Sequence, residues 1–358
     1  MPAITVHTHG RPRTSWRRGG ALALTIAAIG LAACGDDPAA REPEATTMTA
    51  ASAGFPVTVT DCGGRKTIYE KAPERVYGLA DQGVEMLATL GLTDKVVGYS
   101  RFTKKDKVWP KYRELLLKAP AVGPSTEFPT KEEIVALRPD FLISPYQSAF
   151  SNKSKLPNRN GWKEFGANAY LLVGDCDEQG GTKALDNFDY LFTDTRELGK
   201  VFGVQYRAEA VVADYRKRLD AVADRVSGKK ALRMWNYAGE KTPLVAGAPS
   251  VPNAVMTQAG VKNVFGDERE AYGEVSFEEV VKRDPEVIWV MPDSGASIGF
   301  IDEADGIVKA IMADKRLKDV TAVKNKAFVT ISFNAGGIAS PQNIEALESM
   351  VKQLEARR

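Results

Sequence analysis

From Pro56 onward, short apolar runs alternate with longer stretches in which apolar residues recur at helical spacing. Short apolar runs are typical of strands buried in a sheet, and the stretches between them are typical of amphipathic helices. In the first half the predicted strands are Val57–Thr60, Arg75–Leu79, Lys95–Gly98, Phe141–Ser144 and Tyr170–Val173. Strands that alternate with helices form right-handed crossover units, so the pattern predicts a mainly parallel α/β sheet.

The pattern changes between Asp186 and about Val226, where few turn residues occur and apolar residues keep helical spacing. A helix over Arg207–Val226 would be about 30 Å long at 1.5 Å per residue. That length suffices to cross from one lobe to another. A long surface helix fits the same spacing.

The second half repeats the order of elements of the first. Predicted strands lie at Ala231–Tyr237, Val287–Val290 and Phe328–Ile331, and Ser340 with Pro341 predicts the start of the last helix. Residues 253–266 follow the order of residues 84–98, with Gly260 and Gly91 as the helix stops. We therefore predict two related α/β lobes, at 56–185 and 228–358, joined by a helical linker region at 186–227.

Each half also contains one copy of a short element. Thr130 and Ser276 are both followed by two glutamates, an apolar pair, and a proline nine residues after the hydroxyl residue. The hydroxyl residues are good helix N-caps, and Glu133 and Glu279 stand at the third helical position of a capping box.

One glutamate in each copy, Glu132 or Glu278, has no local role in this pattern. A carboxylate near a helix N-terminus is favourable in itself, by a few tenths of a kcal/mol. Its occurrence in both copies nevertheless points to a shared function.

Residues 1–33 have the order of a targeting segment. Arg11, Arg13, Arg17 and Arg18 precede an apolar stretch that is too short to span a membrane, and Leu31-Ala-Ala-Cys34 follows it. This is the pattern of a bacterial lipoprotein signal, so we expect Cys34 to carry the lipid. An ordinary secretory signal is the alternative.

Removal of this segment changes the net charge from +2 to −2, because 44 basic and 46 acidic residues remain. Nothing in this balance indicates a nucleic-acid surface. Residues 34–55 are rich in Ala, Thr, Pro, Asp and Glu without periodicity, which predicts a flexible tether.

Cys62 and Cys176 are the remaining cysteines. In an exported protein such a pair is most simply a disulfide, which would contribute roughly 3–5 kcal/mol in the chain-entropy model. A two-cysteine metal site is the weaker alternative, because neither cysteine has a neighbouring histidine or cysteine.

Over residues 55–358 the chain resembles the substrate-binding lipoproteins of bacterial ABC importers, in the group that serves iron–siderophore, haem and cobalamin uptake. The resemblance rests on Ala72-Pro-Glu-Arg-Val76, on Gly91-Leu-Thr-Asp-Lys-Val-Val-Gly98 and on both glutamate elements. It implies two α/β lobes joined by one long rigid helix, with the ligand in the cleft between them.

The resemblance also implies that Glu132 and Glu278 pair with arginines of the membrane permease. The expected partners are therefore an ABC permease dimer with its ATPase and a small-molecule ligand. We expect a monomer that is anchored to the outer side of the cell membrane through its lipid alone.

The ligand residues are expected where strands end, because ligands of α/β sheets bind at the carboxyl ends of strands. Aromatic side chains there could pack a chelate, and an arginine could pair with an anionic group. The candidates are Asp81, Gln82, Tyr99, Arg101, Phe102, Tyr146, Gln147, Trp235, Asn236, Tyr237, Phe333 and Asn334. Ordinary core or loop packing would explain any one of the aromatic residues by itself.

The two histidines, His7 and His9, both lie in the targeting segment. A haem or metal site built on imidazole is therefore excluded from the mature protein, and we expect no resident cofactor or metal. A ferric siderophore brings its own metal ligands and is the first choice. A corrinoid or an anionic deazaflavin-cofactor precursor comes next.

Two other classes of function are weaker. The sequence has no Gly-x-Ser-x-Gly, His-Glu-x-x-His or phosphate-loop pattern, so a secreted hydrolase would depend on carboxylates alone. A surface adhesion or signalling module would use the fold only for contacts. We therefore expect a binding protein and not an enzyme.

Overall fold

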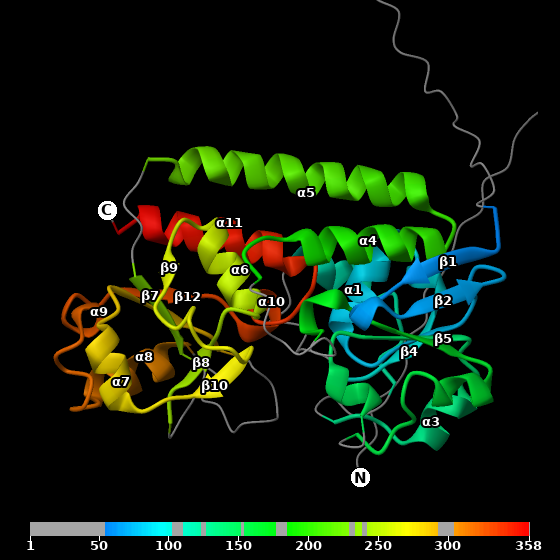
Figure 1. Cartoon of the computed structure of the whole chain (residues 1–358), viewed down its shortest axis with the longest axis horizontal. Coiled ribbons are helices and arrows are strands. Elements are labelled where there is room, and N and C mark those ends of the chain that lie inside the picture. Colours follow the sequence, from blue (N-terminus) through cyan, green and yellow to red (C-terminus); the bar gives the residue numbers. More distant parts are fainter. Residues whose placement is uncertain are drawn as a thin grey trace, which may run out of the picture. The chain divides into compact units, whose positions relative to one another are not determined.

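The computed structural model describes residues 54–101, 110–122, 127–151, 154–176, 185–228, 233–237, 242–292 and 304–357. The targeting segment, Cys34 and most of the tether lie outside these residues. The expected lipid on Cys34 and the expected flexibility of the tether therefore stay predictions. The described chain contains two parallel four-stranded sheets with helices around them (Figure 1).

The two sheets have the same strand order. The first contains β3 (Val76–Gly78), β4 (Val96–Tyr99), β5 (Phe141–Ser144) and β6 (Asn168–Leu171), in the order β4-β3-β5-β6. The second contains β7 (Arg233–Tyr237), β9 (Lys262–Asn263), β11 (Val287–Val290) and β12 (Phe328–Thr330), in the order β12-β11-β7-β9. In both sheets the strand that comes second in the chain lies at one edge, and the first, third and fourth strands follow in that order. The prediction of two related, mainly parallel α/β lobes is confirmed.

Each lobe also has a small antiparallel pair. In the first lobe β1 (Val57–Thr60) pairs with β2 (Lys66–Tyr69), and in the second β8 (Leu244–Ala246) pairs with β10 (Tyr272–Glu274). Strand β6 begins and ends two residues before the predicted run.

Several of the helices around the sheets were predicted from the sequence, whereas α2, α8, α9 and α10 were not. The described helices are α1 (Asp81–Thr89), α2 (Pro110–Leu116), α3 (Lys131–Ala136), α4 (Asp189–Val201), α5 (Gln205–Val226), α6 (Val251–Gln258), α7 (Phe277–Arg283), α8 (Ala304–Ala313), α9 (Thr321–Lys324), α10 (Phe333–Gly336) and α11 (Gln342–Glu355). Helix α11 starts one residue later than predicted, because Pro341 takes the N-cap position and Ser340 Oγ accepts from the N–H of Gln342 at 3.1 Å.

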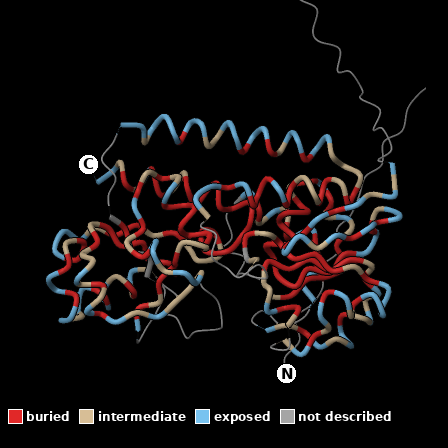
Figure 2. Tube along the Cα trace, in the orientation of Figure 1, coloured by how far each residue is buried: buried red, intermediate tan, exposed pale blue. Residues whose placement is uncertain are grey.

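Helix α5 is the long helix predicted from the middle of the chain, and it connects the two lobes (Figure 1). At its start Arg207 donates to the carbonyl of Leu90 in the first lobe at 3.2 Å. Further along, Arg218 donates to Glu345 and Glu348 of α11 at 2.7–3.0 Å. The tube in Figure 2 shows that most of its outer face is exposed.

Both ends of α5 lie against the repeated glycine turns. Gly91 and Gly260 end α1 and α6 with left-handed φ angles of 71° and 68°. A Cβ on Gly91 would lie 3.1 Å from the Arg207 guanidinium, and one on Gly260 would lie 3.1 Å from Cβ of Val226. The same glycine stop thus lets the linker helix approach closely in each lobe.

A line of polar contacts, the interlobe seam, joins the two lobes near α11. It consists of Gln82, Glu85 and Tyr112 on the first lobe and Asn334, Gln342 and Glu345 on the second. The contacts are Glu85 with Gln342 at 2.5 Å, Tyr112 with Glu345 at 3.1 Å and Gln82 with Asn334 at 3.4 Å. Because Glu85 is fully buried and close to Asp81 and Glu345, its pKa is raised well above the usual value, chiefly by desolvation.

Cys62 and Cys176 form a disulfide, as expected. It ties the turn between β1 and β2 to the segment after β6, 114 residues further along the chain. Cys62 is 1 % exposed and lies in a cluster with Leu142 and Trp162, so the bridge belongs to the packing of the first lobe. No helix of the described chain is long and apolar enough to cross a membrane.

Loss of this disulfide should destabilise the protein. A bridge that closes a loop of more than 100 residues stabilises by about 3–5 kcal/mol, mainly by restricting the unfolded chain. The double variant C62S/C176S should therefore have a lower urea midpoint with a nearly unchanged ligand affinity. Wild type unfolded under a reducing agent serves as the control and should match the variant. Equal midpoints for oxidised and reduced wild type would contradict this account.

The Glu85→Gln variant should change how stability depends on pH. A carboxyl whose pKa is raised on folding holds its proton more tightly in the folded state, so stability is lost as pH rises above about 4.5, its unfolded value. Glutamine keeps the oxygen that accepts from Gln342 but cannot ionise. The variant's gain in melting temperature should grow from pH 5 to pH 8. The exposed Glu114→Gln variant controls for the lost charge, and an equal trend in both would refute the assignment to burial.

Candidate functional site

The two glutamate elements occupy the same place in their lobes. Helix α3 lies in the chain between β4 and β5, and α7 lies between β9 and β11. In each sheet these are the second and third strands in chain order, and the connection crosses the first strand. A crossover helix runs opposite to the strand that follows it, so its first turn lies toward the carboxyl edge of the sheet. Glu132 and Glu278 are therefore topologically equivalent.

The capping box predicted for α3 is confirmed. The side chain of Thr130 accepts from the N–H of Glu133 at 3.3 Å, and the Glu133 carboxylate accepts from the N–H of Thr130 at 2.8 Å. Burial contributes little to this helix, because among its residues only Ile134 is fully buried. The cap therefore fixes where the helix begins and thus where Glu132 lies.

The capping role predicted for Glu279 is wrong. Ser276 does cap α7 through the N–H of Glu279 at 3.2 Å, but the Glu279 carboxylate accepts from Arg283 at 2.8 Å and Lys282 at 3.3 Å. The cause is local, since α7 places an arginine four residues after the glutamate, whereas α3 has Leu137 there.

Glu132 and Glu278 are exposed, and the pKa of each is held below its usual value. For both, the first cause is the hydrogen bond from the residue's own N–H at the helix start. Lys131, 3.4 Å from the Glu132 carboxylate, adds to the effect there, and the Ser276 hydroxyl and the charge of Arg316 add to it at Glu278. Both groups are thus carboxylates at neutral pH and face solvent.

A further pair of residues holds α3 in place from its other end. The Arg75 guanidinium donates to the carbonyls of Leu137 and Arg138 at 2.7 and 3.0 Å, which would otherwise be unsatisfied at the helix end. Asp140 accepts from the N–H groups of Glu74 and Arg75 at 2.9 Å. These contacts explain two features of the sequence, Glu74-Arg75 before β3 and the acidic residue after Pro139.

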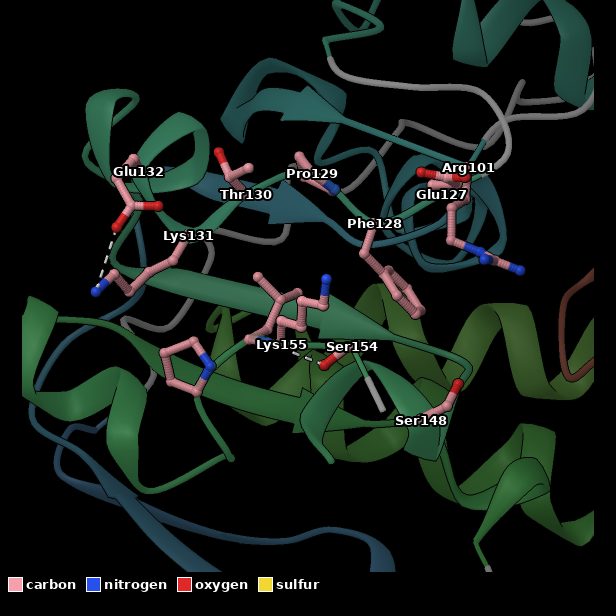
Figure 3. Close-up of a pocket in the computed structure, with 12 residues that line it drawn as sticks. Arg101, Glu127, Phe128, Pro129, Thr130, Lys131, Glu132, Ser148, Ser154 and Lys155 are labelled. Carbon is pink, nitrogen blue, oxygen red and sulfur yellow. Dashed lines mark hydrogen bonds and ion pairs between the residues drawn. The ribbon is translucent and has the colours of Figure 1, made fainter. Parts of the chain in front are cut away.

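A groove of about 900 Å³ runs along the first lobe beside α3 (Figure 3). Arg101, Phe128 and Ser148 line one end of it, and Lys131 and Glu132 line the other. The segment Phe128–Thr130 forms one wall and Ser154–Pro157 lies opposite. A candidate ligand residue and a candidate docking residue thus border the same cavity.

Arg101 lies beside two aromatic rings. Its guanidinium carbon lies 4.6 Å from the ring centre of Phe128 and 4.7 Å from that of Tyr146. The two rings meet edge to face at 6.4 Å, and Arg101 has a left-handed φ of 47°, which is uncommon for a residue with a side chain. Such strained positions cluster at functional sites.

Phe128 was not among the residues predicted from the sequence. Its position directly before Pro129 and the Thr130 cap is the signal that could have found it, because the element fixes the backbone there.

The other predicted ligand residues fall into three groups. Gln82 and Asn334 meet across the interlobe seam, and the Phe333 ring packs against Tyr272 at 5.8 Å. Asp81 and Tyr99 are only 1 % and 3 % exposed, so they offer a ligand little surface, and Gln147 begins a short helical turn after Tyr146. Phe102 lies outside the described residues, as do the side chains of three residues of β7, namely Trp235, Asn236 and Tyr237.

The described residues contain no group of three or more His, Cys, Asp or Glu side chains that could hold a metal ion. What they do offer is a stacked cation beside a groove and two exposed carboxylates. This arrangement suits recognition of a ligand and of a partner surface.

Comparison with known proteins shows the family of the chain. Residues 79–335 match the periplasmic binding protein family. The chain belongs to this family. The match includes α1, the residues around Arg101 and both glutamate elements, and it confirms the resemblance to substrate-binding proteins of ABC importers.

Relatives of this periplasmic binding protein cover nearly its whole length. It is 21 % identical to an uncharacterised ABC transporter substrate-binding lipoprotein, YvrC, of Bacillus subtilis, over 93 % of this chain and 95 % of that protein. It is 24 % identical to a cobalamin-binding protein of Halobacterium salinarum, over 92 % and 81 % of the two chains. The crystal structure of an ABC-type Fe3+-hydroxamate transport system from Saccharomonospora viridis superposes with a TM-score of 0.70 at 24 % identity, over 84 % and 99 % of the two chains.

Proposed function

We propose that this periplasmic binding protein captures a ferric siderophore-type complex between its lobes and delivers it to a membrane permease. The observation that carries the proposal is the stacked Arg101 at the end of β4, beside a groove that reaches the exposed Glu132. The protein would act outside the cytoplasm as a monomer, anchored through the lipid on Cys34.

The chemistry of Arg101 favours an anionic chelate. A guanidinium fixed between two rings keeps its planar fork of donors oriented, which suits carboxylate, catecholate or hydroxamate oxygens. The rings of Phe128 and Tyr146 add flat apolar surface beside it. A siderophore supplies all ligands to its iron, so a mature chain without histidine can carry it.

A corrinoid is the second candidate ligand. Relatives named cobalamin-binding or vitamin B12-binding proteins support it, and they include several from Vibrio species. Both ligands are large, flat or globular chelates with apolar faces, so the same stacked site would serve either. The role in transport is the same in both cases.

The permease is proposed to bind the two equivalent glutamates. Each is exposed at a helix start, one in each lobe, so a partner that contacts both lobes would meet a carboxylate on each. Charges at such a rim favour association rate and orientation more than affinity.

Replacement of Arg101 should separate anionic from neutral ligands. Arg101→Ala removes a charge-assisted hydrogen bond, which is worth about 1.5–3 kcal/mol, or at least tenfold in affinity. The loss should be large for a ferric tris-catecholate, which is anionic, and small for a neutral ferric hydroxamate of similar size. Quenching of tryptophan fluorescence measures both, and cobalamin is titrated alongside them.

Arg101→Lys is the matched control, because it keeps the charge but not the planar stack, and it should give an intermediate loss. Lys155→Ala removes a cation from the opposite wall of the groove and should leave both affinities within about twofold. If wild type binds cobalamin and no ferric complex, the siderophore assignment fails and the corrinoid takes its place.

Removal of both docking carboxylates should abolish transport but not binding. The variant E132A/E278A should take up less than about a tenth of the wild-type ligand in cells, since two charged contacts are lost at once. Its ligand affinity and melting temperature should stay near wild type, because both side chains are exposed.

The control for this pair is E133Q/E279Q, which changes the same charge on the adjacent residues of the same helices. The variant weakens the cap of α3 by Glu133 and removes the ion pair of Glu279 with Arg283 in α7. The melting temperature should therefore fall slightly while uptake persists. Normal uptake by E132A/E278A would remove the docking assignment.

A further inference from the structure

The surroundings of the two docking glutamates differ in one respect. Beside Glu132, the ammonium of Lys131 is 3.4 Å from the carboxylate and 5.2 Å from the ring centre of Phe165. Lys131 thus has two alternative acceptors, an anion on one side and an aromatic face on the other. Its side chain is 38 % exposed, so it has room to move between them.

Phe165 is held so that its ring stays at the surface. It is 38 % exposed and is the last residue of a short helical turn, Gly161–Phe165, that ends at Gly166 with a left-handed φ of 76°. The ring packs edge to face on Trp162 at 6.0 Å, and Trp162 is fully buried.

The cation beside Glu278 is fixed instead. Arg316 lies 3.5 Å from the ring centre of Phe277, and it donates to both oxygens of Asp314 at 2.6–3.1 Å. Phe277 is only 7 % exposed. Arg316 therefore lies on the Phe277 ring, whereas Lys131 forms an ion pair with the Glu132 carboxylate.

We propose that Phe165 is a positioning residue for docking, because it accepts the Lys131 ammonium when a cationic group of the permease takes over the Glu132 carboxylate. This inference rests on the proposed permease role of Glu132. Without the ring, Lys131 would remain within about 4 Å of the incoming cation, and like charges at that distance repel. With it, the ammonium keeps the contact that it already makes with the aromatic face at 5.2 Å, and this cation–π contact compensates for the ion pair that it leaves. The first-lobe docking surface is then Glu132, Lys131 and Phe165 together.

A double-mutant cycle on the full-length protein tests this, with binding measured to the permease–ATPase complex in nanodiscs. Phe165→Leu keeps the apolar volume but removes the aromatic face, and it should weaken docking about two- to fivefold. Lys131→Met removes the repelling charge and should strengthen docking by a similar factor. In the K131M background F165L should have no further effect, since there is no cation left to place.

Lys163→Met is the matched control, because it removes the same charge from the same surface turn as Phe165. It should change docking by less than the K131M variant does. Melting temperatures should be unchanged in all variants, and ligand affinity should be unchanged in F165L and K163M, whose side chains do not line the groove. Docking of K131M is measured without ligand, because Lys131 does line the groove. If F165L weakens docking equally with and without Lys131, the ring contacts the permease directly and the proposal is wrong.

The experiment distinguishes failure of the positioning role of Phe165 from failure of the proposed docking role of Glu132 and Glu278. If wild type binds no permease, or E132A/E278A binds as well as wild type, both the docking assignment and this inference fail. If E132A/E278A loses binding but F165L and K131M behave as wild type, only the positioning role of Phe165 is overturned.

Discussion

The structure depends first on how α5 is seated across both lobes. Among the described strands, none pairs with a strand of the other lobe, and α5, α11 and the seam connect the two lobes. The helix can lie close at each end only because α1 and α6 stop at glycines with left-handed φ. Between these ends Arg218 binds two carboxylates of α11, so the helix is fixed by charge as well as by packing.

The seam explains why the two lobes take one arrangement. Apolar contacts alone tolerate small shifts, whereas a buried hydrogen bond is lost when its partners slide apart. Glu85 with Gln342 and Tyr112 with Glu345 are such bonds, and burial raises the pKa of Glu85. Burying these groups costs stability, and in return the register between lobes is specified. We therefore regard the seam as the reason that one bridging helix suffices.

The sequence predicted the fold well because the fold follows from local signals. Alternating apolar runs, glycine stops and hydroxyl caps each act within about ten residues, and the eight strands predicted with bounds all begin within two residues of the predicted start. Strands β2, β8, β9 and β10 were not predicted. The sequence also predicted that Glu133 caps the helix and Glu132 does not, since this difference depends on helix position alone. The prediction for Glu279 was wrong because two local partners compete for its carboxylate, the backbone N–H of Ser276 and the side chain of Arg283. In the structure the carboxylate accepts from Arg283.

The surroundings of Arg101 were predicted less completely, because they depend on contacts between distant segments. The pattern placed Arg101 and Tyr146 at strand ends but could not show that a third side chain, Phe128, would complete the stack. Nor could it separate Tyr99, which is buried in the core, from Tyr146, which is only partly buried and contacts Arg101, since both were expected after a strand.

That third residue gives the site its most informative feature. Phe128 stacks on the candidate ligand residue Arg101, and two residues later Thr130 caps the helix that carries Glu132. The proposed ligand site and the proposed permease site therefore share one short segment of backbone. In the second lobe, Glu278 follows a cap whose preceding residues contact no equivalent ring stack among the described side chains. In the first lobe, therefore, the residue that contacts the candidate ligand site and the helix that the permease is proposed to bind are two residues apart in the chain.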